Sequence, residues 1–139
     1  MKELTVEARI ENLDNVTDFV LSEIDDGKCP KKTQTQIMIA VEEVFVNISN
    51  YAYYPDIGNA TVRVAVNSDD VITIEFEDSG KAFNPLENTD PDISSKPEER
   101  EIGGLGIFMV KKIMDSVEYE YRDKKNILKL LKQLSKPNH

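Results

Sequence analysis

The spacing of apolar side chains predicts three helices. Apolar residues recur at intervals of three and four over residues 13–24 and again over residues 37–51, which places them along one face of each helix. A third segment with this spacing opens directly from the glycines at 103–106. The inward stripe expected for the second helix is Ile37, Val41, Val44, Ile48 and Tyr51. The residues expected to end the first two helices are Gly27, Pro30, Pro55 and Gly58.

Alternation of apolar and polar residues predicts five strands. The segments are residues 4–8, 61–67, 71–77, 117–122 and 127–134. The short polar turns expected between strands are residues 67–70 and 123–126. Tight turns favour antiparallel neighbours, so we expect an α+β fold: a two-layer sandwich with a mixed, mainly antiparallel sheet and helices on one face.

Residues 81–102 follow neither pattern. The segment holds three prolines, many charges and few apolar residues. A loop of this length inside a compact domain is usually functional or disordered. At 139 residues the chain has the size of one domain, which we expect to span residues 1–139.

Composition excludes several function classes. The net charge of −9 argues against a nucleic-acid surface and suits a partner with a basic patch. The single cysteine, Cys29, cannot form an intrachain disulfide. We see no signal peptide and no apolar run of membrane-spanning length, so we expect a soluble, cytoplasmic protein that binds neither nucleic acid nor membrane.

Glu43 and Asn47 lie one helical turn apart on the second predicted helix. At about 100° per residue they fall side by side on the flank of the apolar stripe, where core meets surface. An amide oxygen can ligate Mg²⁺, and a carboxylate one turn away can orient or deprotonate an attacking hydroxyl. A solvated i,i+4 pair on an ordinary helix remains an alternative.

Asp78 continues the inward phase of its strand and precedes Gly80 by two residues. A carboxylate therefore stands where an apolar side chain is expected, and a buried carboxylate needs partners. As an acceptor it can receive the exocyclic amine of adenine. A plain Asp-x-Gly turn that closes the strand remains open as well.

Gly103, Gly104 and Gly106 expose backbone N–H groups where the third helix begins. Unpaired donors and the positive end of the helix dipole favour anions there, although a flexible junction would also use glycine. If phosphates bind, the preceding loop is expected to act as a lid over about residues 81–103, with Lys96 and Arg100 as its cations.

In this order the segments resemble the ATP-binding domain shared by gyrase, Hsp90, histidine kinases and MutL. The marks of that family are a Glu/Asp-x-x-x-Asn helix, an Asp-x-Gly, and a glycine-bearing end of a lid. The likeness is greatest to the bacterial anti-sigma-factor serine/threonine kinases, above all in GGLGIFMVKKIMDSVEY, and covers nearly the whole chain.

The resemblance implies ATP and Mg²⁺ as cofactors and assigns a role to each site residue. Glu43 would be the catalytic base, and Asn47 would coordinate Mg²⁺. Asp78 would bind adenine. The further nucleotide contacts that the resemblance implies are Gly80, Ala82, Gly103, Gly104, Leu105 and Gly106.

Two implied contacts depart from the family pattern. Family members use an arginine shortly before the glycines to steady the terminal phosphate; Ile102 stands at that place, and Arg100 lies two residues earlier. The family often carries a threonine facing adenine near the last strand, and Asn126 stands about there.

The resemblance further implies a homodimer that binds a sigma factor and phosphorylates an anti-sigma-factor antagonist on Ser or Thr. The only histidine is His139, which sets aside phosphorylation of a histidine in cis. Two alternatives remain: a nucleotide-dependent binding switch without significant catalysis, and an orphan ATP domain serving a histidine-bearing partner.

Overall fold

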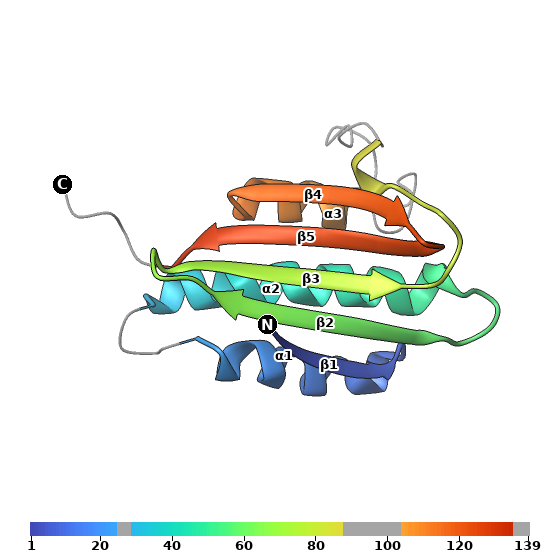
Figure 1. The fold of residues 1–139 in the computed structure, drawn as a ribbon, viewed down its shortest axis with the longest axis horizontal. Helices are drawn as coiled ribbons and strands as arrows, with labels where there is room; N and C mark the ends of the chain where they lie inside the picture. Colours follow the sequence, from blue (N-terminus) through green and yellow to red (C-terminus); the bar gives the residue numbers. More distant parts are fainter. Residues whose placement is uncertain (25–28, 88–103, 135–139) are drawn as a thin grey trace.

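The computed structural model describes residues 1–24, 29–87 and 104–134. Figure 1 shows an α+β sandwich in which one sheet forms a layer and the helices lie together against one of its faces. The elements of the first half are β1 (Lys2–Glu7), η1 (Ile10–Asn12), α1 (Leu13–Ser22), α2 (Lys31–Asn47) and a π-helical turn, η2 (Ile48–Ala52). Those of the second half are β2 (Asn59–Val66), β3 (Val71–Asp78), η3 (Pro85–Glu87), α3 (Gly104–Ile113), β4 (Ser116–Arg122) and β5 (Lys125–Gln133).

The five strands form one sheet in the order β1-β2-β3-β5-β4. Every pairing within it is antiparallel, so the predicted sheet is confirmed and is more regular than the mixed arrangement expected. The central β3–β5 pair sets Asp78 opposite Asn126. This register brings two polar residues, 48 positions apart in the chain, to the same end of the sheet.

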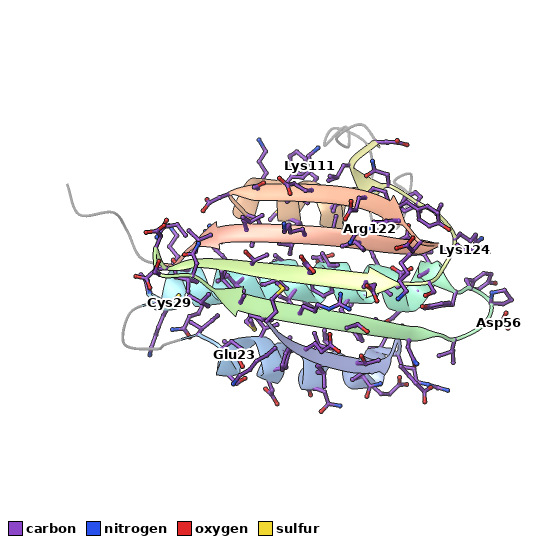
Figure 2. The ribbon with its side chains drawn as sticks, in the orientation of Figure 1. Glu23, Cys29, Asp56, Lys111, Arg122 and Lys124 are labelled. Atoms are coloured by element: carbon purple, nitrogen blue, oxygen red, sulfur yellow. The ribbon has the colours of Figure 1, made fainter. Side chains whose placement is uncertain are left out.

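The turn between β4 and β5 is shorter than expected. Arg122 pairs with Lys125, and Asp123 and Lys124 have φ of 54° and 62°, as in a two-residue hairpin turn. Asn126 is therefore a strand residue and not part of the turn. Figure 2 shows Arg122 and Lys124 at this end of the sheet and Cys29 at the opposite end.

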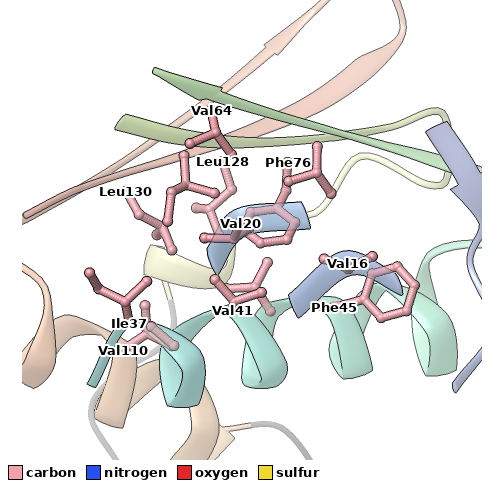
Figure 3. Packing of buried hydrophobic residues seen from close by; sticks show 14 of the residues in the cluster. Val16, Val20, Ile37, Val41, Phe45, Val64, Phe76, Val110, Leu128 and Leu130 are labelled. Atoms are coloured by element: carbon pink, nitrogen blue, oxygen red, sulfur yellow. The ribbon is translucent and has the colours of Figure 1, made fainter. Parts of the chain in front are cut away.

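The core lies between the sheet and the helices. Figure 3 shows Ile37, Val41 and Phe45 of α2 facing Phe76 and the leucines of β5. These side chains are buried because the apolar stripe of α2 and the inward phase of the strands meet, as the two periodicities require.

The predicted stripe of α2 departs from the structure at its end. Ile37, Val41, Val44 and Ile48 are buried, but Tyr51 is 43% exposed. Tyr51 belongs to η2, where a π-helical turn changes the rotation per residue and moves it off the α-helical stripe. The tyrosine expected in the core therefore borders a cavity instead.

Candidate functional site

A cavity of about 720 Å³ lies at the end of the sheet where β3 finishes and β5 begins. This volume is within the range of small-molecule sites, which is about 300–1,000 Å³. Its wall comes from α2 and η2, from the end of β3 and the loop after it, and from α3, β4 and β5. The lining residues are Val44, Asn47, Ile48, Asn50, Tyr51, Ala52, Tyr54, Phe76, Asp78, Lys81, Ala82, Phe83, Pro85, Ile107, Tyr119, Asn126 and Leu128.

Asp78 is the buried carboxylate of this cavity, with 7% of its surface exposed. Its Oδ1 accepts two hydrogen bonds, from the backbone N–H of Gly80 at 2.9 Å and from Nδ2 of Asn126 at 3.0 Å. Among the described residues none donates to Oδ2. One oxygen is thus held by the protein while the other remains an open acceptor for a ligand amine.

Burial also shapes the protonation of Asp78. Desolvation raises the pKa of this carboxyl, and the hydrogen bonds from Asn126 and Gly80 work in the opposite direction. A ligand N–H donated to Oδ2 would favour the ionised form in the same way as these two bonds. Ligand binding and ionisation of Asp78 are therefore expected to be coupled.

Asn47 and Glu43 occupy the predicted flank of α2, and both are half-buried, whereas the neighbouring Glu42 is exposed. Asn47 lines the cavity. Neither Asn47 nor Glu43 has a side-chain hydrogen bond or ion pair with any other described residue. Both polar groups are therefore available to a ligand. Because Asn47 lines the cavity, it is not a residue of a solvated surface pair.

Glu43 lies beside the first turns of α3 instead of in the cavity wall. A Cβ atom built on Gly106 would be 2.4 Å from Oε2 of Glu43, so only glycine leaves room for the carboxylate there. The positive end of the α3 dipole favours a negative charge at this place. The α2–α3 interface thus brings together two predicted site residues separated by more than sixty positions.

The residues present fit a magnesium ion that is shared with a nucleotide. Within the described ranges, no cluster of three or more His, Cys, Asp and Glu side chains could hold a metal by itself. Mg²⁺ usually takes only one or two protein oxygens and completes its shell with phosphate and water. The unpartnered amide of Asn47 can supply one such oxygen.

Gly80 is required because the backbone of Ala52 packs too closely against it for any side chain to fit. A Cβ atom there would be 2.1 Å from the carbonyl oxygen of Ala52, at the end of η2. The same carbonyl accepts the N–H of Lys81 at 3.1 Å. Gly80 therefore allows the loop after β3 to pack against the end of η2, and Ala82 follows in the cavity wall.

Part of the predicted site falls outside the described residues: Lys96, Arg100, Gly103 and most of the proposed lid. Of the glycine segment, the backbone at Gly104 begins α3, as expected. Residues 81–87 form part of the cavity wall and include the short helix η3, which the sequence did not predict.

Several side chains of the cavity were not among the predicted site residues. Tyr51, Tyr54 and Phe83 are exposed aromatic residues at its wall, and Tyr119 reaches it from β4. The tyrosine-rich run NYAYYP, which begins three residues after Asn47, was a usable signal. Helical periodicity assigned Tyr51 to the core, so it was not predicted as a residue of the cavity wall.

The fold and the cavity together define a class: an α+β domain with a cavity of small-molecule size at one end of an antiparallel sheet. A profile of the family described as "Histidine kinase-like ATPase domain" matches residues 6–132. The match covers most of the chain, which therefore belongs to this family. No described helix has the length and apolarity needed to cross a membrane.

Sequence relatives carry more specific names. The chain is 35% identical over 92 residues to an anti-sigma F factor of Clostridium perfringens, covering 65% of each protein. It is 33% identical over 84 residues to an anti-sigma F factor of Caldanaerobacter subterraneus, covering 60% of this chain and 58% of that protein. It is 27% identical over 118 residues to the serine-protein kinase RsbW of Bacillus cereus, covering 82% of this chain and 67% of that protein.

Solved structures agree on the fold. The blue-light-activated histidine kinase of Erythrobacter litoralis superposes with a TM-score of 0.58 at 17% identity, covering 90% of this chain and 41% of that one. Its histidine kinase domain gives a TM-score of 0.52 at 20% identity, covering 76% and 49%. At these identities the likeness supports the architecture alone.

Proposed function

We propose that the chain is an ATP-dependent protein serine/threonine kinase that acts as an anti-sigma factor. It would bind a sigma factor and phosphorylate an anti-sigma-factor antagonist. The observation that carries the proposal is that Oδ2 of Asp78 and the amide of Asn47, which have no partner among the described residues, line one cavity. The carboxylate of Glu43 lies one helical turn from Asn47, beside Gly106 at the start of α3. The names of the sequence relatives support the choice of substrate and partner.

Each group has a distinct task in this proposal. Mg-ATP supplies the phosphoryl group. Asp78 accepts the adenine amine through Oδ2, and Asn47 gives an oxygen to the metal. Glu43 orients the substrate hydroxyl and takes its proton. The backbone at Gly104 and Gly106 receives phosphate oxygens at the start of α3.

The lid would complete the site. We propose that the segment from about residue 81 to 103 closes over the bound nucleotide and that Arg100 reaches the terminal phosphate. Closure would exclude water, so that the phosphoryl group passes to protein and not to solvent.

Phosphotransfer from radiolabelled ATP to a cognate antagonist tests the proposal. Glu43→Ala should abolish transfer and leave ADP affinity near the parent's, because the carboxylate does not line the cavity. Glu42→Ala, a change at the adjacent exposed position, is the matched control and should retain transfer. Absence of transfer by the parent to a correctly paired antagonist would overturn the kinase assignment.

A second candidate is a nucleotide-dependent binding switch without significant catalysis. The position of Glu43 against α3, outside the cavity wall, favours it. Such a switch would keep nucleotide-dependent control of its partner in the Glu43→Ala variant. A kinase would lose that control, because the antagonist would stay unphosphorylated.

The partner and the assembly are parts of the same proposal. A chain of net charge −9 suits a sigma-factor surface rich in Lys and Arg, and we propose a homodimer acting in the cytoplasm. Sedimentation velocity of the chain alone and with a sigma factor measures both assemblies. Complex formation should weaken as salt rises, because screening reduces attraction between opposite charges.

A further inference from the structure

Asn126 is surrounded by protein hydrogen-bonding groups and is 7% exposed. Its Nδ2 donates to Oδ1 of Asp78 at 3.0 Å and to the carbonyl of Lys81 at 2.8 Å. Its Oδ1 accepts the backbone N–H of Phe83 at 3.1 Å and the hydroxyl of Tyr119. An amide offers two N–H hydrogens and two lone pairs, so all four positions are used.

The neighbours also fix which way the amide points. A backbone carbonyl can only accept, and a backbone N–H can only donate. The carbonyl of Lys81 therefore requires Nδ2 on its side, and the N–H of Phe83 requires Oδ1 on the other. A flipped amide would set acceptor against acceptor and donor against donor.

We infer that Asn126 is a positioning residue that makes no contact with the nucleotide. It holds Asp78 and the loop at 81–83 in the shape that receives the base, with help from Tyr119. The inference rests on the proposed nucleotide site. Because Nδ2 of Asn126 and the N–H of Gly80 both engage Oδ1, Oδ2 of Asp78 is left as the acceptor for the ligand. A direct contact with the base would require Asn126 to give up an existing bond.

Protonation of Asp78 reports on this arrangement. Tyr119 faces it from β4 and Tyr53 from the end of η2; burial raises the pKa of both phenols, so both stay neutral near neutral pH. The residues paired with Asp78 on its two neighbouring strands are Ala60 and Asn126, and neither titrates.

The charged neighbour of Asp78 on its own strand is paired with cations. Glu77 precedes it on β3 and forms ion pairs with Arg63 at 3.1 Å and Lys125 at 3.5 Å. The residues of α2 that line the cavity carry no titratable group. The other titratable side chains of the cavity wall are Lys81, Tyr51 and Tyr54.

The first test compares Asn126→Ala with Asn67→Ala. Asn67 caps the β2–β3 turn by accepting the N–H groups of Asp69 and Val71, so its loss also removes side-chain hydrogen bonds from this sheet, at the end away from the cavity. We expect Asn126→Ala to weaken Mg-ADP binding by about tenfold or more, the effect of removing a hydrogen bond to a charged group. Asn67→Ala should leave affinity unchanged.

The second test uses Asn126→Asp, which keeps the acceptor for Phe83 and Tyr119 but loses the donor to Asp78. Two carboxyls at this separation are expected to share one proton, and that proton can replace the missing N–H. Mg-ADP binding by this variant should therefore fall as pH rises from about 6 to about 9, when the shared proton leaves. Binding by the parent should stay level or rise over this range.

A measurement without nucleotide separates this inference from the proposed function. Carbon-13 NMR of the Asp78 carboxyl should show a higher pKa in Asn126→Ala than in the parent, because a bond that stabilises the ionised form is gone. A parent that does not bind Mg-ADP would overturn the proposed function but leave this shift to be measured. An unchanged Asp78 titration in Asn126→Ala, or an Asn126→Asp variant with the parent's pH profile, would overturn the positioning role.

Discussion

Glu43 and Gly106 lie in contact across the α2–α3 interface, where a single added carbon would meet a carboxylate oxygen at 2.4 Å. The need for glycine at residue 106 is one of space, since the position lies within a regular helix. The contact ties the side chain proposed as the base to the helix whose first turn is proposed to bind phosphate. Substitutions at this contact can therefore separate folding from chemistry.

Gly106→Ala should inactivate without unfolding. The colliding atom is the far end of a flexible side chain, so Glu43 can turn aside at little cost. Alanine also favours a helix by about 1 kcal/mol over glycine. We expect an unfolding midpoint at or above the parent's and a loss of phosphotransfer, measured by thermal unfolding and radiolabel transfer.

The double variant with Glu43→Ala is the control for this prediction. If alanine at position 106 acts by displacing Glu43, the two changes together should cost no more activity than Glu43→Ala alone. Additive losses would show that Gly106 acts independently of Glu43.

Gly80→Ala should have the opposite character. Here the added carbon would meet the backbone of Ala52 at 2.1 Å, and backbone cannot turn aside. We expect a loss of about 2 kcal/mol or more in unfolding free energy, as for overpacking, together with weaker nucleotide binding. Urea unfolding compared with Gly106→Ala measures the contrast; equal stability of the two variants would contradict it.

Asp78→Asn should bind nucleotide poorly and yet fold well. Asparagine can still accept the Gly80 and Asn126 donors, but it can present an N–H where Oδ2 offered an acceptor. Mg-ATP affinity should fall by about tenfold or more, measured by calorimetry. Unchanged affinity would show that Asp78 does not receive the base.

The stability of Asp78→Asn should depend on pH in a defined direction. Burial raises the pKa of Asp78 in the folded state, so the ionised carboxylate opposes folding, and stability is lost as pH rises through that pKa. As pH rises from acid to neutral, the unfolding free energy of Asp78→Asn should increase relative to that of the parent. This difference in unfolding free energy should vanish below about pH 3.5, where the Asp78 carboxyl is protonated in both the folded and the unfolded parent. Chemical unfolding across this range measures it.

Asn47→Ala should abolish the dependence of nucleotide binding on Mg²⁺. Its amide is expected to supply one metal ligand, so the variant should bind ADP about equally with magnesium and with EDTA. Asn50→Ala removes an amide that also borders the cavity and serves as the control. Retained magnesium dependence in Asn47→Ala would exclude Asn47 as the ligand.

Periodicity alone was enough to predict most of the fold. Alternating and helical apolar spacings are imposed by burial against one core, so they determined the strands, the helices and the α+β class. The inward phase of β3 predicted a buried carboxylate at Asp78, and the flank of α2 predicted half-buried positions for Glu43 and Asn47. These are local patterns that packing preserved.

Local patterns failed where a backbone irregularity changed the phase. The π-helical turn moved Tyr51 out of the core, and the two-residue hairpin at Asp123 and Lys124 moved Asn126 from a turn into a strand. The spacing of apolar residues predicts neither change. The π-helical turn alters the rotation per residue, and the hairpin turn alters the strand register, and a prediction from spacing takes both as regular.

The sequence by itself thus determined which residues are proposed to carry chemistry: an acceptor, an amide and a carboxylate on elements whose inward and outward phase it predicted. Only the tertiary structure decided which of them meet. The register of β3 with β5 set Asn126 against Asp78, and the packing of α2 on α3 set Glu43 against Gly106. Such contacts join segments far apart in the chain, and their geometry follows from the packing of the whole domain and not from any local period.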